Sequence, residues 1–264
     1  MADTGAARLA GLFGSTRPAL LPYLTAGIPD ANSSPAMFEA MEAADGFEVG
    51  IPYADPLMDG PVIAAAGRFA IGAGMTVRGA IGIIGEVAEK TGKPVIAMTY
   101  TNPILRLGVD EFLSEIAAAG ASGLIVADLP VEEATPYLDS ARRHGIGMAL
   151  FVAPTTVPER LATIAARQPA FLYGVATLGV TGERAKLDDT AAVLSQRVRA
   201  ATDLPLVLGV GISTPGQAAA AGILADGVIV GSAIVRTVMD APSAEAAAAA
   251  VMGQVDDLAT ALRR

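Results

Sequence analysis

The chain of 264 residues has no cysteine, which excludes disulfide bonds and thiol chemistry. It has one histidine, His144, and a single imidazole without cysteine cannot form the usual ligand cluster of a transition metal. His144 follows two arginines and precedes Gly145, which is typical of a cation near the C-terminus of a helix. We therefore expect no metal site and interpret His144 as a surface residue.

Lysine is also scarce, because the chain contains only Lys90, Lys93 and Lys186. Lys90 and Lys93 precede an expected strand, and Lys186 falls in an expected loop. None lies at the end of a strand, which is where barrel enzymes place their catalytic groups. The sequence therefore disfavours an aldolase that forms a Schiff base.

Basic clusters and long apolar runs are missing as well. The formal net charge is −9, which argues against nucleic acids and acidic membranes as partners. The longest apolar runs, residues 204–212 and 227–235, are far shorter than the roughly 20 residues of a membrane helix. The first residues lack the basic-then-apolar pattern of a signal peptide. We expect a cytoplasmic protein.

Short apolar runs alternate with helix-like segments along the whole chain. The runs are bounded by Gly, Pro and Asp and are too apolar to have a wet face, which is typical of parallel strands covered on both sides. The expected strands are residues 19–25, 46–50, 94–100, 123–127, 147–152, 170–175, 206–210 and 227–230. The expected helices are residues 33–44, 62–71, 77–90, 110–119, 131–143, 157–167, 188–200 and 215–221, and an alanine-rich helix over 243–262.

Eight strands in strict alternation with helices predict an α/β fold. We expect a single (β/α)8 TIM barrel with parallel strands and extra terminal helices, formed by residues 1–264 as one domain. No linker, charge block or change of composition divides the chain. A doubly wound open sheet is the alternative. In a barrel, the reactive groups lie at the C-terminal ends of the strands and in the loops that follow them.

Two acids lie at that end of the second expected strand. Glu48 stands between Phe47 and Val49, and the alternation of side chains along a strand places it on the face opposite to theirs. If Phe47 and Val49 pack against helices, Glu48 points into the barrel, where an ionised acid is costly without a partner or a task. Asp59 ends the proline-rich loop that follows. A partnered core acid and an ordinary turn acid are the structural alternative.

Two glycine-rich stretches, Gly-Val-Gly-Ile-Ser at 209–213 and Val-Gly-Ser-Ala-Ile at 230–234, end the last two expected strands. Glycine lets the backbone approach an anion, and the N-terminus of a helix offers free N–H groups. The loops after strands seven and eight are the usual phosphate site of this fold. An ordinary helix cap is the alternative. The residues predicted to bind phosphate are Gly182, Gly211, Ser213, Gly231 and Ser232.

The segment at residues 48–61, Glu-Val-Gly-Ile-Pro-Tyr-Ala-Asp-Pro-Leu-Met-Asp-Gly-Pro, resembles the signature of the tryptophan synthase alpha chain family. Three further motifs extend the resemblance over nearly the whole chain: Ala-Asp-Leu-Pro-Val-Glu-Glu, Gly-Val-Thr-Gly and Gly-Val-Gly-Ile-Ser. The resemblance implies a lyase of tryptophan biosynthesis that cleaves indole-3-glycerol phosphate to indole and glyceraldehyde 3-phosphate. It implies no cofactor in this chain.

The resemblance makes Glu48 and Asp59 the catalytic acids. Protonation of ring carbon 3 of the substrate gives a cationic indolenine, which takes up the electrons when the side chain leaves. Glu48 would donate that proton and remove the proton of the glycerol hydroxyl next to the breaking bond, which requires a raised pKa. Asp59 would accept a hydrogen bond from the indole N–H and stabilise the developing positive charge.

The resemblance also implies a lining for the substrate and a partner. The lining residues would be Tyr23, Met98, Tyr100, Tyr173 and Thr181, the last in a loop that closes over the substrate in the family. A place in the barrel core is the alternative for Tyr23, Met98 and Tyr173. In the family, indole passes through a tunnel to a beta chain that holds pyridoxal phosphate, in an assembly of two alpha and two beta chains. The expected contact residues are Pro52, Asp55, Pro56, Asn102, Pro103, Asp128 and Pro130, for which ordinary loop chemistry is the alternative.

The sequence departs from the family at the N-terminus, where the helix expected around residues 8–13, which plugs the barrel bottom in relatives, looks short. Residues 62–74 are rich in Gly and Ala for the helix expected there. Two other functions are weighed. Another phosphate-sugar barrel enzyme, such as indole-glycerol-phosphate synthase, needs strand lysines that are missing here. A non-catalytic subunit is disfavoured by the intact pair of Glu48 and Asp59.

Overall fold

Eight parallel strands form a closed barrel in the computed structural model, which describes residues 4–175, 187–209 and 211–263. They run in sequence order around the barrel, and the last strand pairs with the first. The strands are Ala19–Thr25 (β1), Phe47–Gly50 (β2), Val95–Thr99 (β3), Gly123–Val126 (β4), Gly147–Val152 (β5), Phe171–Gly174 (β6), Leu206–Leu208 (β7) and Gly227–Val230 (β8). The predicted TIM barrel is confirmed, and the open doubly wound sheet is excluded.

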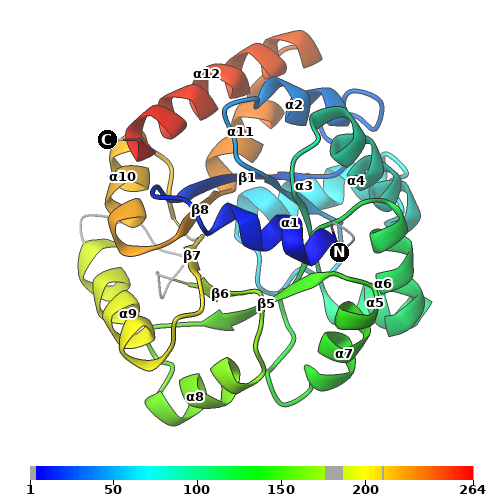
Figure 1. Cartoon of the computed structure of the whole chain (residues 1–264). Helices are drawn as coiled ribbons and strands as arrows, with labels where there is room; N and C mark the ends of the chain where they lie inside the picture. The colour runs from blue at the N-terminus through cyan, green and yellow to red at the C-terminus, as the bar shows by residue number, and fades with distance from the viewer. Residues whose placement is uncertain (1–3, 176–186, 210, 264) are drawn as a thin grey trace.

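Helices surround this barrel, and one of them, α1, lies across its end (Figure 1). The helices of the described ranges are Gly5–Leu12 (α1), Ser34–Ala40 (α2), Pro61–Gly72 (α3), Val77–Thr91 (α4), Thr101–Leu107 (α5), Val109–Ala118 (α6), Thr135–Arg143 (α7), Pro158–Ala166 (α8), Leu187–Ala201 (α9), Pro215–Leu224 (α10), Ser232–Asp240 (α11) and Ala244–Leu262 (α12). Two of them, α5 and α11, are absent from the prediction. The predicted starts and ends were also wrong for α2, which stops at Ala40, and for α7, which starts at Thr135, because turns occupy residues 42–43 and 131–133.

Helix α1 closes the bottom of the barrel, where it crosses the centre of the view in Figure 1. A Cβ atom on Gly123 or Gly147 would lie 2.9 or 2.8 Å from a methyl carbon of Leu9, so these two glycines make room for the helix. Just beyond α1, the ring of Phe13 lies 5.4 Å from that of Phe171, which is on β6. The expected N-terminal plug is therefore present, and it begins three residues earlier than predicted.

The register of the strands places Glu48 inside the barrel. Glu48 lies beside Tyr23 of β1 and Ile96 of β3, and neighbouring residues of adjacent strands share one face of a sheet. Phe47 faces the other way, toward α2, where its ring meets that of Phe38 at a centroid distance of 5.5 Å. The condition for an inward-facing Glu48 is thus fulfilled.

No single helix among the described residues is both long and apolar enough to cross a membrane. Helices α3 and α4 reach the necessary length and composition only as a pair, and that pair is bent by 107°.

Candidate active site

Glu48 is an almost fully buried acid, with 2% of its surface exposed. Its Oε2 atom has no hydrogen-bond partner among the described residues. Burial, and secondly the nearby Asp59 carboxylate, raise the pKa of Glu48 to about 8. At neutral pH the carboxyl group therefore holds its proton, as a general acid must.

Asp59 lies in the loop formed by residues 51–60, which joins β2 to α3 and is called here the β2–α3 loop. Its N–H donates to the carbonyl of Pro56 at 3.1 Å, which closes a tight turn. Burial raises the pKa of Asp59 to about 6, and a hydrogen bond from the Tyr100 hydroxyl opposes that rise. Between about pH 6 and pH 8, Asp59 is therefore ionised while Glu48 is protonated. One acid can donate a proton while the other stabilises a cation.

Tyr100 connects the β2–α3 loop to the next strand. It follows β3 directly, is the N-cap of α5, and is 2% exposed. Its hydroxyl accepts a hydrogen bond from the backbone N–H of Met58 at 3.2 Å and donates one to Asp59. Tyr100 therefore fixes the end of the loop that carries Asp59.

Two further tyrosines, Tyr23 and Tyr173, enter the same interior. A Cβ atom on Gly50 would lie 2.1 Å from the Tyr23 hydroxyl, and one on Gly209 would lie 2.0 Å from the Tyr173 hydroxyl. Burial, together with the charges of both carboxylates, raises the pKa of each phenol well above its usual value. Both rings therefore face the cavity that holds Glu48.

The role of Gly50 and Gly209 in making room for these rings was not predicted from the sequence. Their signal would have been a glycine at an inward-facing strand position beside an inward-facing tyrosine. Met98 is partly buried against the core, so it fits both interpretations that the sequence allowed. Thr181 and Gly182 lie outside the described residues.

The predicted phosphate residues lie at the ends of β7 and β8. Gly211 has a φ of +81°, a conformation that favours glycine. A Cβ atom on Gly231 would lie 3.5 Å from the Tyr23 ring, so this end of the cavity adjoins the tyrosine. Helix α11 begins at the exposed Ser232 without a side-chain cap and without an acid in its first turn. Its first N–H groups are therefore available to an anion.

Ser213 differs from the prediction because its donors are already used. Both its N–H and its hydroxyl donate to Oε1 of Gln217, at 2.9 and 3.0 Å, and the N–H of Thr214 does so at 3.2 Å. Gln217 also completes a capping box with Thr214 at the start of α10. The Thr-Pro-Gly-Gln pattern at residues 214–217 could have revealed this contact.

The predicted contact residues for a partner surround this end of the barrel. Asp128 accepts hydrogen bonds from the N–H and the hydroxyl of Thr101, at 2.7 and 2.8 Å, and so caps α5. Asn102 donates to the Tyr53 hydroxyl at 2.8 Å. Asp55, Asn102, Asp128 and Pro130 are exposed, Pro52 and Pro56 are partly buried, and Pro103 is buried. Pro103 thus offers a partner less surface than the sequence suggested.

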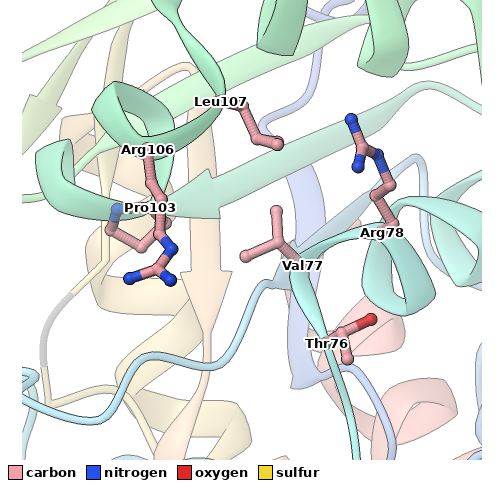
Figure 2. Close-up of a pocket in the computed structure, with 6 residues that line it drawn as sticks. All are labelled: Thr76, Val77, Arg78, Pro103, Arg106 and Leu107. Atoms are coloured by element: carbon pink, nitrogen blue, oxygen red, sulfur yellow. The ribbon is translucent and has the colours of Figure 1, made fainter.

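A separate surface cleft lies between α4 and α5 (Figure 2). It has a volume of about 410 Å³ and contains neither acid. Figure 2 shows Val77 and Leu107 pointing toward one another, with Arg106 on one side and Arg78 on the other. The residues that line it are Thr76, Val77, Arg78, Pro103, Arg106 and Leu107. It adjoins the rim at Pro103 and is not the active site.

The histidine and the lysine Lys93 lie away from the two acids. No group of three or more His, Asp or Glu side chains there could hold a metal ion. Lys93 donates to the backbone carbonyls of Glu42 and Ala44 before β3, away from the acids. His144 is the C-cap of α7 and lies 3.2 Å from Asp110, in agreement with a surface role.

The raised pKa of Glu48 predicts a dependence of stability on pH. The folded chain holds this proton up to about pH 8, whereas the unfolded chain releases it near pH 4.5. This contribution to stability is therefore complete below pH 4.5 and is lost as the pH rises through 8. Glu48→Gln removes the titration. Between about pH 4.5 and pH 8, the wild type should lose several kcal/mol more of its free energy of unfolding than the variant, on the order of 1 kcal/mol per pH unit, and little outside this interval. Urea unfolding across this range measures the difference, and parallel pH profiles would contradict it.

Comparisons with known proteins identify the family of this chain. A family model described as the tryptophan synthase alpha chain matches residues 9–263. The tryptophan synthase alpha chain of Streptomyces avermitilis is 43% identical over 249 residues, which cover 94% of this chain and 90% of that protein. That of Mycobacterium marinum is 44% identical over 241 residues, with 89% of each chain covered.

Solved structures give the same result. Tryptophan synthase from Mycobacterium tuberculosis matches with a TM-score of 0.88 and 38% identity, over 97% of this chain and 98% of that one. The tryptophan synthase complex from Pyrococcus furiosus matches with a TM-score of 0.83 and 34% identity, over 92% and 98%. The barrel, the paired acids and these likenesses together show that the chain belongs to the tryptophan synthase alpha chain family.

Proposed function

We propose that Glu48 and Asp59 are the acids with which this member of the family cleaves indole-3-glycerol phosphate into indole and glyceraldehyde 3-phosphate. The observation that carries the proposal is the position of the two acids: Glu48 is buried inside the barrel with an Oε2 atom that has no partner among the described residues, and Asp59 lies in the loop after the same strand. Burial raises the pKa of Glu48 to about 8 and that of Asp59 to about 6, so between these values Glu48 is protonated and Asp59 is ionised. A proton donor and an anion thus share one cavity near neutral pH.

The reaction then needs only groups that this chain supplies. Glu48 donates its proton to ring carbon 3, and the ring becomes a cationic indolenine whose N–H donates a hydrogen bond to Asp59. The Glu48 carboxylate next takes the proton of the adjacent hydroxyl group. The carbon–carbon bond breaks, its electron pair restores the aromatic indole, and the hydroxyl carbon becomes an aldehyde. The negative charge of Asp59 stabilises the cation in a site with little water.

We assign the substrate phosphate to the ends of β7 and β8. The free N–H groups at the start of α11, and the glycine backbone at positions 211 and 231, support this place. Gly231 lies beside Tyr23, and the charges of Asp59 and Glu48 help to raise the pKa of Tyr23. A phosphate at Gly231 would therefore anchor one end of the substrate while the indole reaches the two acids. Tyr173 and Met98 are assigned to the wall around it, with Thr181 and Gly182 as further contributors.

The direct test is the formation of indole from indole-3-glycerol phosphate by the purified chain. The wild type should release indole and glyceraldehyde 3-phosphate in equal amounts, without added metal or cofactor. The absence of turnover, both alone and with a tryptophan synthase beta chain, would contradict the proposal.

We further propose that the rim of the barrel binds a beta chain holding pyridoxal phosphate, in an assembly of two alpha and two beta chains. The similar structure from Pyrococcus furiosus is that of a tryptophan synthase complex, which supports such a partner. Leu57 and Met58 of the β2–α3 loop are 81% and 65% exposed, and Leu105 of α5 is 58% exposed. Exposed apolar side chains beside an active site are typical of a docking surface.

The docking surface can be tested by size-exclusion chromatography with the beta chain. The wild type should co-elute with it, and Leu57→Asp should weaken binding at least about tenfold, since the charge would lose its water in an apolar contact. Ile223→Asp is the matched control, because Ile223 is 85% exposed but lies on α10. Equal weakening by both variants, or no co-elution of the wild type, would contradict the proposed surface.

A further inference from the structure

Two tyrosines join the β2–α3 loop to the start of α5. The hydroxyl of Tyr53 accepts a hydrogen bond from Nδ2 of Asn102 at 2.8 Å. The ring of Tyr53 packs on that of Tyr100, with 5.3 Å between the centroids and 35° between the planes. Tyr53 is thus held at its hydroxyl by α5, while its ring contacts the residue that caps the same helix.

The packing of Tyr53 on Tyr100 matters because the Tyr100 hydroxyl makes two hydrogen bonds. A phenol has one O–H to donate, and here the oxygen accepts from the N–H of Met58 while the hydrogen goes to Asp59. A displacement of the Tyr100 ring would weaken both bonds. Because Tyr53 packs against that ring, it limits such a displacement.

We propose that Tyr53 is a positioning residue for Asp59, that it acts through the ring of Tyr100, and that Asn102 holds Tyr53 in place. The effect on catalysis rests on the function proposed above for Asp59. The effect on the ionisation of Asp59 does not.

Tyr53→Phe tests the proposal, because it keeps the ring and removes only the hydroxyl. The Tyr100 hydroxyl stabilises the ionised form of Asp59, so a looser Tyr100 should raise the pKa of Asp59. The pKa of the Asp59 carboxyl can be followed by carbon NMR without any substrate. In turnover, the acid limb of the kcat profile should move to higher pH. At pH 7, kcat should fall about three- to tenfold, the effect of one hydrogen bond, while KM stays within about twofold.

A double-mutant cycle shows whether Tyr53 acts through Tyr100. In a Tyr100→Phe background, adding Tyr53→Phe should change kcat by less than about twofold, because the bond to Asp59 is already lost. Asn102→Ala should reproduce the raised pKa of Asp59 seen in Tyr53→Phe. Tyr137→Phe is the matched control, since Tyr137 lies on α7, outside the site, and should leave both readouts unchanged.

Three results would overturn the proposal: an unchanged Asp59 pKa in Tyr53→Phe, an equal loss of kcat with and without the Tyr100 hydroxyl, or the same shift in Tyr137→Phe. If the wild type fails to cleave indole-3-glycerol phosphate, the function proposed for the two acids fails. The NMR titration then still decides whether Tyr53 positions Asp59.

Discussion

Glu48→Gln is expected to lower kcat for indole formation by at least about 10²–10⁴-fold, the usual effect of losing a general acid. Glutamine has nearly the same shape, but its amide cannot give a proton to carbon or take one from a hydroxyl group. Because Glu48 is assigned both proton transfers, the variant lacks a catalyst for the protonation of ring carbon 3 and for the removal of the hydroxyl proton. KM should change little, since the proposed phosphate anchor at α11 is untouched.

Steady-state kinetics of indole release measure this effect. In the wild type, kcat should also fall as the pH rises through about 8, where Glu48 loses its proton, and the residual activity of the variant should lack that limb. Glu159→Gln, an exposed acid at the start of α8, is the matched control and should behave as the wild type. Turnover by Glu48→Gln close to that of the wild type would remove Glu48 from the mechanism.

Asp59→Asn is expected to lower kcat by about 10²–10³-fold, the usual loss when one preorganised electrostatic group is removed from an active site. The amide oxygen of asparagine can still accept a hydrogen bond from the indole N–H. It carries no negative charge, however, so the indolenine cation loses its counter-ion in a buried site. The loss should therefore appear in kcat rather than in KM.

The same variant gives a second, independent readout. The charge of Asp59 contributes to the raised pKa of Glu48, so its removal should shift the basic limb of the kcat profile to lower pH. Asp203→Asn, an exposed acid before β7, should change neither kcat nor this limb. If Asp59→Asn keeps a normal turnover number, the loop acid has only a structural role.

Much of the barrel was predictable, because buried parallel strands are apolar throughout and are bounded by turn residues. The predicted bounds of β1, β5 and β8 agree with the structure, and those of the other strands differ by one or two residues. Helix α5 was missed because it is short and because Asp128, whose side chain binds the N–H of its first residue, Thr101, comes from the end of another strand. Helix α11 has an apolar pattern at Ile234, Val235 and Val238 that indicates a helix. It was missed because the Gly-Ser pair at its start was interpreted only as part of a phosphate-binding loop.

The site was predictable to the extent that it depends on strand position. Alternation along β2 decided where Glu48 points, and the loop after that strand brought Asp59 to the same end of the barrel. The contacts of Gln217 with Ser213 and of Asn102 with Tyr53 were not predicted. The Asn102 contact joins residues 49 positions apart, and the position of Tyr53 in the loop does not show which way its hydroxyl points. The Asn102 contact depends on side-chain direction, which local sequence patterns do not encode. The Gln217 contact did have a local signal, the Thr-Pro-Gly-Gln pattern at residues 214–217.

Leu9 of α1, which closes the bottom of the barrel, also limits the route by which small molecules reach the barrel interior. Leu9 fills that end, so a molecule that reaches Glu48 in the proposed reaction has to enter and leave at the other end, where the strands finish. A beta chain bound at that rim, as proposed above, would cover this opening. We therefore expect its binding to change the rate at which indole and glyceraldehyde 3-phosphate are released.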